Sequence, residues 1–96
     1  MLTREDILRL LAENRAELAR LGARRIGLFG SFARNEARSD SDVDILVDID
    51  RHEFDRYMNL KFSLEDLFGR EVDLVLSDKL KPALRERILG EVINAA

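Results

Sequence analysis

Apolar residues recur every three or four positions in three segments of the chain, and this spacing predicts three amphipathic helices. The first helix begins after Thr3, which can cap a helix, and ends at Gly22. The second helix spans Glu53–Phe68, and the third runs from near Pro82 to Asn94. The residues expected to pack into the core from these helices are Ile7, Leu8, Leu11, Leu18, Leu21, Phe54, Tyr57, Met58, Leu64, Phe68, Leu84, Ile88 and Val92.

Three shorter segments are rich in aliphatic residues and predict β-strands. They are Arg25–Phe29, Asp42–Ile49 and Glu71–Ser77. Between the first two strands, Ser31 is expected to cap a brief helix that continues through about Ala37. Helices and strands thus alternate along the chain, which predicts a small α/β domain with at least three strands.

The second and third strands carry carboxylates on one face and aliphatic side chains on the other. Successive side chains in a strand point to opposite faces, so Asp42 and Asp44 lie opposite Val43 and Ile45. In the third strand, Asp73 lies opposite its aliphatic neighbours in the same way. We therefore expect a small mixed β-sheet with helices packed on one face, and with the three aspartates together on the open face.

Composition narrows the class of protein. The chain has 96 residues, of which 46% are hydrophobic and 36% charged, as expected for one soluble domain over residues 1–96. Its net charge is −3, which argues against a nucleic-acid-binding surface. There is no cysteine, so disulfides and thiolate metal sites are excluded. Without an apolar run of membrane-spanning length or a signal peptide, the expected location is the cytoplasm, with no membrane partner.

The residues around the carboxylates predict a site for a phosphate and a metal. Three clustered aspartates repel one another and need a cation, and hard oxygen ligands favour Mg²⁺, with Mn²⁺ as the alternative. Gly30 and Ser31 follow a strand and open a helix, where backbone N–H groups can approach a phosphate. Arg34 and Arg38 could neutralise the outer phosphates, and Ser39 or Ser41 could add a hydrogen bond. Together these features are typical of phosphoryl or nucleotidyl transfer.

Ten residues separate Gly30-Ser31 from Asp42-Val43-Asp44, and with this spacing the chain resembles the nucleotidyltransferase superfamily, whose signature is G-S-x10-D-x-D. It is most similar to the minimal members of that superfamily, the MNT proteins, in the motifs "GSFAR", "SDSDVDILV" and "EVDLV". Asn35 is a departure, because relatives often have glycine after "GSFAR". Asn tolerates a left-handed backbone better than most residues, so we expect the turn to be kept.

The resemblance implies the nucleotidyltransferase fold and a mechanism with two metal ions. Asp42 and Asp44 would bind Mg²⁺ that bridges the triphosphate of ATP, and Asp73 would join them at a second ion, where the acceptor hydroxyl attacks the α-phosphorus. The nucleotide would be bound by Gly30, Ser31, Arg34 and Ser41. MNT proteins are commonly encoded beside a helical HEPN toxin and act as its antitoxin by nucleotidylating it, so a HEPN protein is the partner that the resemblance implies.

Two other functions remain open. The chain would be a contact-only antitoxin if it neutralised such a partner without catalysis, although a pure binder has no need of three clustered acids. It would instead be the catalytic subunit of an aminoglycoside-type nucleotidyltransferase if its acceptor were a small molecule. We favour a protein acceptor, because one short domain leaves little chain to enclose a second substrate.

Several conspicuous residues have simpler interpretations. His52, the only histidine, is expected to carry no chemistry. Asp48 and Asp50 are expected to end their strand in solvent. Arg38 is as easily a solvated residue as a phosphate ligand. The aromatic residues expected in core or interface packing, rather than in base stacking, are Tyr57, Phe62 and Phe68. No residue that selects the base can be identified.

Overall fold

A mixed sheet of four strands in the order β3-β2-β1-β4 forms the centre of the fold. The computed structural model describes residues 1–95; of the predicted domain, residue 96 lies outside the described part. The elements are α1 (Arg4–Glu13), α2 (Arg15–Arg20), β1 (Ala23–Phe29), α3 (Gly30–Ala33), β2 (Val43–Ile49), α4 (Phe54–Phe68), β3 (Val72–Leu76), the 3-10 turn η1 (Ser77–Lys79), α5 (Pro82–Glu91) and β4 (Ile93–Asn94). No helix in this part of the chain is long and apolar enough to cross a membrane.

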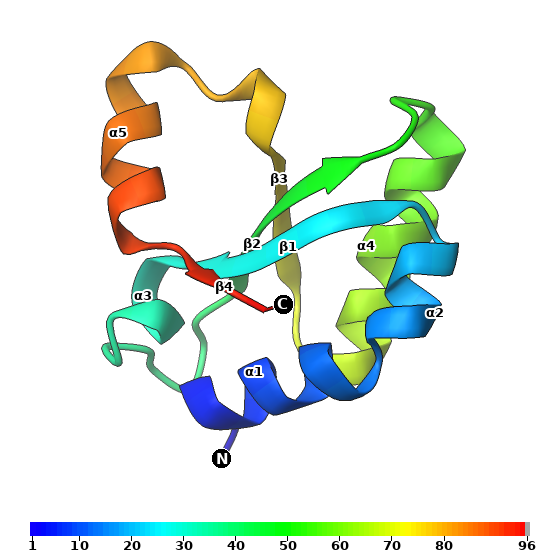
Figure 1. Cartoon of the computed structure of the whole chain (residues 1–96). Coiled ribbons are helices and arrows are strands. Elements are labelled where there is room, and N and C mark those ends of the chain that lie inside the picture. The colour runs from blue at the N-terminus through cyan, green and yellow to red at the C-terminus, as the bar shows by residue number, and fades with distance from the viewer. Residues whose placement is uncertain (96) are drawn as a thin grey trace.

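The connections between the strands explain the mixed sheet. β1 is antiparallel to both β2 and β4, whereas β2 and β3 are parallel (Figure 1). A parallel pair needs a long crossover, and α4 supplies it between β2 and β3. The register sets Asp44 of β2 directly beside Asp73 of β3. The mixed α/β architecture predicted from the sequence is therefore confirmed.

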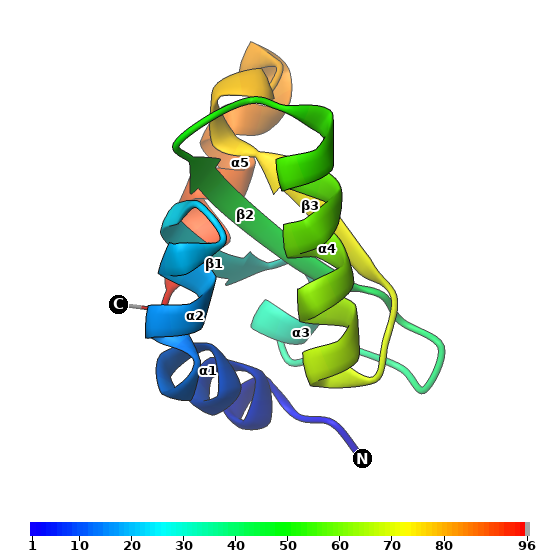
Figure 2. The same ribbon diagram turned by 90° about the vertical axis from the view of Figure 1, so that its right-hand side faces the viewer.

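The main hydrophobic core lies between one face of the sheet and three helices. Figure 2 shows α1, α2 and α4 in front of the sheet and α5 behind it. The strand parity is as predicted, since Val43, Ile45 and Val47 are at most 1% exposed. Each such burial contributes about 1.5–3 kcal/mol to folding. The fully buried partners from the helices are Ile7, Leu11, Leu60 and Leu64.

A second, smaller hydrophobic cluster lies on the other face of the sheet. It consists of Phe29, Leu46 and Ile88, so it packs α5 against β1 and β2. Leu46 shares the strand face of Asp44, and burial under α5 explains why an aliphatic residue stands between acidic ones. This face is therefore open around the aspartates, while α5 covers the neighbouring part.

The first predicted helix is two helices. α1 ends at Glu13 and α2 begins at Arg15, with Asn14 between them at φ −104° and ψ 15°. The Asn14 side-chain amide donates to the Leu10 carbonyl at 2.8 Å. Asn side chains compete with the backbone for its own hydrogen bonds, which makes Asn14 the natural point for the break.

The brief helix α3 differs from its prediction at both ends. It starts at Gly30 rather than after Ser31, so Ser31 lies inside the helix and is not its cap. It ends at Ala33, well before Ala37. The reason lies in Asn35, whose φ of 63° is left-handed and turns the chain. The expectation that Asn35 keeps the turn is confirmed.

The end of the chain contains a strand that the sequence pattern did not predict. α5 ends at Glu91 rather than Asn94, and residues 93–94 form β4, paired with Gly27 and Leu28 of β1. A two-residue strand has no measurable periodicity, so only the unpaired edge of β1 could have indicated it. Two residues expected in the core are exposed, Phe54 at 75% and Leu84 at 44%.

Candidate active site

The site is organised by the close approach of Gly30 to Asp44. Gly30 has φ +73°, and a Cβ added to it would lie 2.0 Å from Asp44 Oδ2. The β1–β2 register pairs Phe29 with Asp44, which brings the end of β1 against this carboxylate. Gly30 is therefore required twice over, because its backbone is left-handed and because no side chain fits beside Asp44.

The surroundings of the Asp44 carboxyl disfavour its negatively charged form. Partial burial, together with the charges of Asp73 and Asp42, raises the pKa of Asp44 from 3.8 to about 6. A hydrogen bond from the Ser31 backbone and the charge of Arg34 act in the opposite direction but are outweighed. A carboxylate whose ionised form is repelled by two neighbours favours a bound cation.

The three predicted aspartates differ in how closely they come together. Asp44 and Asp73 are direct neighbours across the parallel ladder, and Asp73 is exposed. Asp42 lies one residue before β2, is exposed, and acts on Asp44 through its charge. Within residues 1–95, no three acidic or histidine side chains converge into a ready-made metal site. The donor set nevertheless fits a divalent cation, because Asp44 and Asp73 are neighbours with hard carboxylate oxygens and the charge of Asp42 also acts on Asp44.

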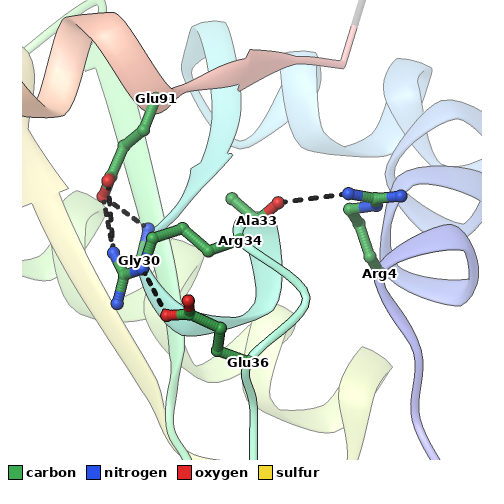
Figure 3. Close-up of polar contacts among 6 residues, drawn as sticks. All are labelled: Arg4, Gly30, Ala33, Arg34, Glu36 and Glu91. Atoms are coloured by element: carbon green, nitrogen blue, oxygen red, sulfur yellow. Dashed lines mark hydrogen bonds and ion pairs between the residues drawn. The ribbon is translucent and has the colours of Figure 1, made fainter.

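Gly30 and Arg34 share one carboxylate that the sequence did not draw attention to. The Gly30 backbone N–H donates to Glu91 Oε1 at 3.0 Å. Arg34 donates from the same guanidinium nitrogen to both Glu91 oxygens, at 3.2 and 3.1 Å (Figure 3). Glu36 accepts from Arg34 Nε at 2.9 Å, and these two acids, Glu36 first, raise the pKa of Arg34. Glu91 was missed because it lies inside a helical pattern with nothing to distinguish it.

The loop before Asp42 is built by hydrogen bonds from two directions. The Ser41 hydroxyl accepts from the Arg38 backbone N–H at 2.8 Å, so Ser41 shapes the loop. Arg70 donates to the Ser41 carbonyl at 2.6 Å, and its guanidinium lies 5.5 Å from the centre of the Phe32 ring. Arg70 thus connects the loop before β3, the loop before β2 and helix α3. A lone arginine after a helix gives no sequence signal of this role.

The remaining candidates lie in packing or ion pairs. Tyr57 donates its hydroxyl to the Leu74 carbonyl, and Phe68 is 7% exposed, so both pack as expected. Phe62 is 52% exposed and lies outside the core, so interface packing stays the expectation for it. His52 pairs with Asp78 at 3.1 Å. Asp50 follows the last residue of β2 and accepts two hydrogen bonds from Arg56, at 2.7 and 2.9 Å.

The most voluminous hollow described, about 570 Å³, is not at the aspartates. It lies between α2 and the edge formed by β1 and β4, and residues such as Leu18, Ala19 and Ile26 line it. Its lining also includes Arg15, Arg24 and Arg25 and contains no acidic group to bind a metal. The charge and geometry around Asp44 therefore define the candidate active site better than cavity size does.

Known proteins match both the sequence and the fold. The nucleotidyltransferase domain family matches residues 8–94. The chain is 44% identical to protein adenylyltransferase MntA of Thermococcus cleftensis, over 97% of this chain and 96% of that relative. A solved structure described as a minimal nucleotidyltransferase is similar with a TM-score of 0.82 at 42% identity, covering 96% of this chain and 95% of that chain.

A more distant likeness concerns the fold alone. A tri-AMPylated Shewanella oneidensis HEPN toxin in complex with MNT antitoxin matches with a TM-score of 0.65 at 20% identity, over 93% of this chain and 71% of that chain. The family match covers nearly all of the chain, including Gly30, Ser31 and the three aspartates. The chain therefore belongs to the nucleotidyltransferase domain family.

Proposed function

We propose that this protein transfers AMP from MgATP to a hydroxyl group of a partner protein. The observation that carries the proposal is the position of the Asp44 carboxylate. It lies in close contact with Gly30 and beside Asp73 of the neighbouring strand, and its pKa is raised to about 6. An acid in this state, next to a glycine turn, is suited to a metal that binds a triphosphate. The name of the Thermococcus relative, a protein adenylyltransferase, supports AMP as the group transferred and protein as the acceptor.

The carboxylates have distinct roles in this proposal. Asp42 and Asp44 would hold one magnesium ion at the triphosphate, and Asp73 would join them at a second. When bound, the ions neutralise the triphosphate charge and make the acceptor hydroxyl more acidic. Asp73 is exposed, so it orients an acceptor that arrives from outside the protein. The acceptor hydroxyl releases its proton to solvent, and its oxygen forms a bond to the α-phosphorus. The bond from the α-phosphorus to the oxygen that bridges to the β-phosphorus breaks, and pyrophosphate leaves.

The phosphates are bound by the turn between β1 and β2. The missing side chain of Gly30 lets the turn lie directly against Asp44, so a phosphate at the turn would lie beside the carboxylate assigned to the metal. Ser31 offers its hydroxyl as a donor. Arg34 adds positive charge and a planar pair of donors suited to phosphate oxygens. Ser41 belongs to the same binding region through the loop before Asp42, which it shapes by accepting from Arg38.

The partner that we propose is a HEPN-type toxin. In the distant Shewanella oneidensis structure, a HEPN toxin that carries AMP groups is in complex with an MNT antitoxin. A hydroxyl on a flexible segment of such a toxin would reach the exposed face around Asp73 more readily than one on a packed helix. Transfer of AMP would then neutralise the toxin.

The test is whether transfer depends on the protein acceptor. The protein is incubated with MgATP alone, with its cognate HEPN protein, or with an aminoglycoside, and products are followed by mass spectrometry. We expect slow turnover alone and addition of AMP units to the HEPN protein. The Asp66→Asn variant, which changes an exposed acid on α4, serves as the control and should remain active. Rapid transfer to the small molecule by the isolated protein would contradict the proposal.

A further inference from the structure

Glu91, the last residue of α5, contacts the Gly30 backbone N–H and the Arg34 guanidinium. These are two of the groups that we propose bind the nucleotide phosphates. The Glu91 carboxylate accepts from the Gly30 backbone N–H at 3.0 Å and from Arg34 at 3.2 and 3.1 Å (Figure 3). The Glu91 side chain is only 19% exposed, whereas that of Arg34 is 40% exposed. Glu91 is therefore anchored by the fold and reaches Gly30 and Arg34 from a segment 57 to 61 residues away in sequence.

The Gly30 N–H and the Arg34 guanidinium nitrogen cannot donate full-strength hydrogen bonds to Glu91 and to a phosphate at the same time. The Gly30 backbone has one N–H, and it already points to Glu91 Oε1. A carboxylate and a phosphate oxygen accept from an N–H or a guanidinium in the same way, so each excludes the other from the same donor.

We propose that Glu91 is a built-in anion that the triphosphate displaces, so that Glu91 lowers the affinity for nucleotide. This inference rests on the proposed function, because it assigns the displaced position to the phosphates of MgATP. In the free protein, Glu91 satisfies Gly30 and Arg34. When the nucleotide binds, Glu91 leaves both, and the triphosphate takes its place.

Glu36 keeps Arg34 in position during this exchange. It accepts from Nε of Arg34 at 2.9 Å, while Glu91 uses a different nitrogen of the same guanidinium. Loss of Glu91 therefore frees one edge of the guanidinium and leaves the other edge held. The free edge then points to the position from which the Glu91 carboxylate has moved.

The displacement transmits nucleotide binding to the end of the chain. Glu91 is followed by Val92, which packs on the second hydrophobic cluster, and by Ile93 of β4, which pairs with Leu28 of β1. Release of the Glu91 carboxylate removes the hydrogen bonds that connect this segment to Gly30 and Arg34. We therefore expect the Glu91–Asn94 segment to become less protected when MgATP is bound.

The first test compares Glu91→Gln with Glu86→Gln, an exposed acid on the same helix. Gln keeps the shape of Glu91 but removes its charge, so its hydrogen bonds to Gly30 and Arg34 weaken. Calorimetric titration should give MgATP binding about tenfold tighter for Glu91→Gln than for wild type, because a charged hydrogen bond is replaced by a neutral one. Glu86→Gln should bind as wild type does. Equal or weaker binding by Glu91→Gln would overturn the displacement and make Glu91 a support for Arg34.

The second test uses the wild-type protein, so its result does not depend on whether a variant folds. Amide hydrogen exchange is measured with and without MgATP, and faster exchange at residues 91–94 is expected in the bound state. Unchanged or slower exchange there, with MgATP bound, overturns the displacement alone. If the wild-type protein and Glu91→Gln both fail to bind MgATP, the proposed function fails as well, so the two failures are distinguishable.

Discussion

Gly30 and Asp44 are so close that the hydrogen atom of the glycine is the only substituent that fits: a Cβ would lie 2.0 Å from Oδ2 and 2.7 Å from Cγ of the carboxylate. This contact joins the turn that we assign to the phosphates to the carboxylate that we assign to the metal. The two motifs, separated by ten residues in the sequence, are thus in direct contact in space. Changes on either side of the contact should affect both functions.

Gly30→Ala should abolish nucleotide binding and lower stability. The new methyl group would displace Asp44, and the left-handed backbone would add about 1 kcal/mol or more of strain. Gly69→Ala is the matched control, since Gly69 has φ +66° but nothing within 4 Å of an added Cβ. That variant should lose about 1 kcal/mol of stability and bind MgATP normally. Chemical denaturation and calorimetry measure the two effects. Normal nucleotide binding by Gly30→Ala would contradict the close contact.

The contribution of Asp44 to the stability of the metal-free protein should fall as pH rises from about 4 to about 6. The pKa of Asp44 is raised from 3.8 to about 6 in the folded protein, so between these values the unfolded chain loses a proton that the folded protein keeps. The stabilisation is fully present below the lower value and is lost as pH passes the higher one. Asp44→Asn should flatten this part of the curve and raise the melting temperature at pH 7. A curve for Asp44→Asn that keeps the wild-type slope would refute the assignment.

Metal affinity should have the opposite pH dependence. A metal binds the ionised carboxylate, so Mg²⁺ affinity in the presence of ATP should increase through pH 6 and level off above pH 7. Asp42→Asn and Asp44→Asn should both weaken Mg²⁺ binding in calorimetric titrations, whereas Asp66→Asn should not. Undiminished affinity in both Asp42→Asn and Asp44→Asn would remove the metal site from these residues.

Arg70 should act as a positioning residue. It donates to the Ser41 carbonyl at 2.6 Å and lies over the Phe32 ring, so it fixes the loop that leads to Asp42. Arg70→Met should lower AMP transfer at least tenfold while costing about 1–3 kcal/mol of stability. Arg70→Lys keeps a charged donor and should restore part of the transfer. Arg87→Met, an exposed arginine on α5, is the control. Full activity of Arg70→Met would show that the loop is held by other contacts.

The sequence predicted the parts of the site that depend on the alternation of side chains in strands and on the spacing between motifs. Strand parity put Asp44 and Asp73 on one face, and the register confirms that they are neighbours. The ten-residue spacing after Ser31 gave the family, which the match over residues 8–94 confirms. The roles of these residues remain predictions that the experiments above test.

What the sequence did not predict depends on contacts between distant segments. Glu91 reaches Gly30 from the far end of the chain, and Arg70 reaches Ser41 across two loops. Neither contact leaves a periodic pattern, because each residue lies on a surface that looks ordinary in sequence. The break at Asn14 arises from one side-chain hydrogen bond within a continuous apolar stripe. β4 pairs with the edge of β1, and its two residues are too few to show a strand pattern in the sequence.

The comparison of Asp73→Asn with wild type tests the central claim most directly, because Asp73 is exposed beside Asp44 and is the acid that we assign to the acceptor. Each protein is mixed with the HEPN partner and MgATP, and the intact mass of the partner and its remaining toxic activity are measured together. We predict that wild type adds AMP units and neutralises the partner, while Asp73→Asn binds MgATP, adds none and leaves the partner active. Neutralisation by Asp73→Asn as complete as that by wild type, without added AMP, would contradict the account and identify a contact-only antitoxin.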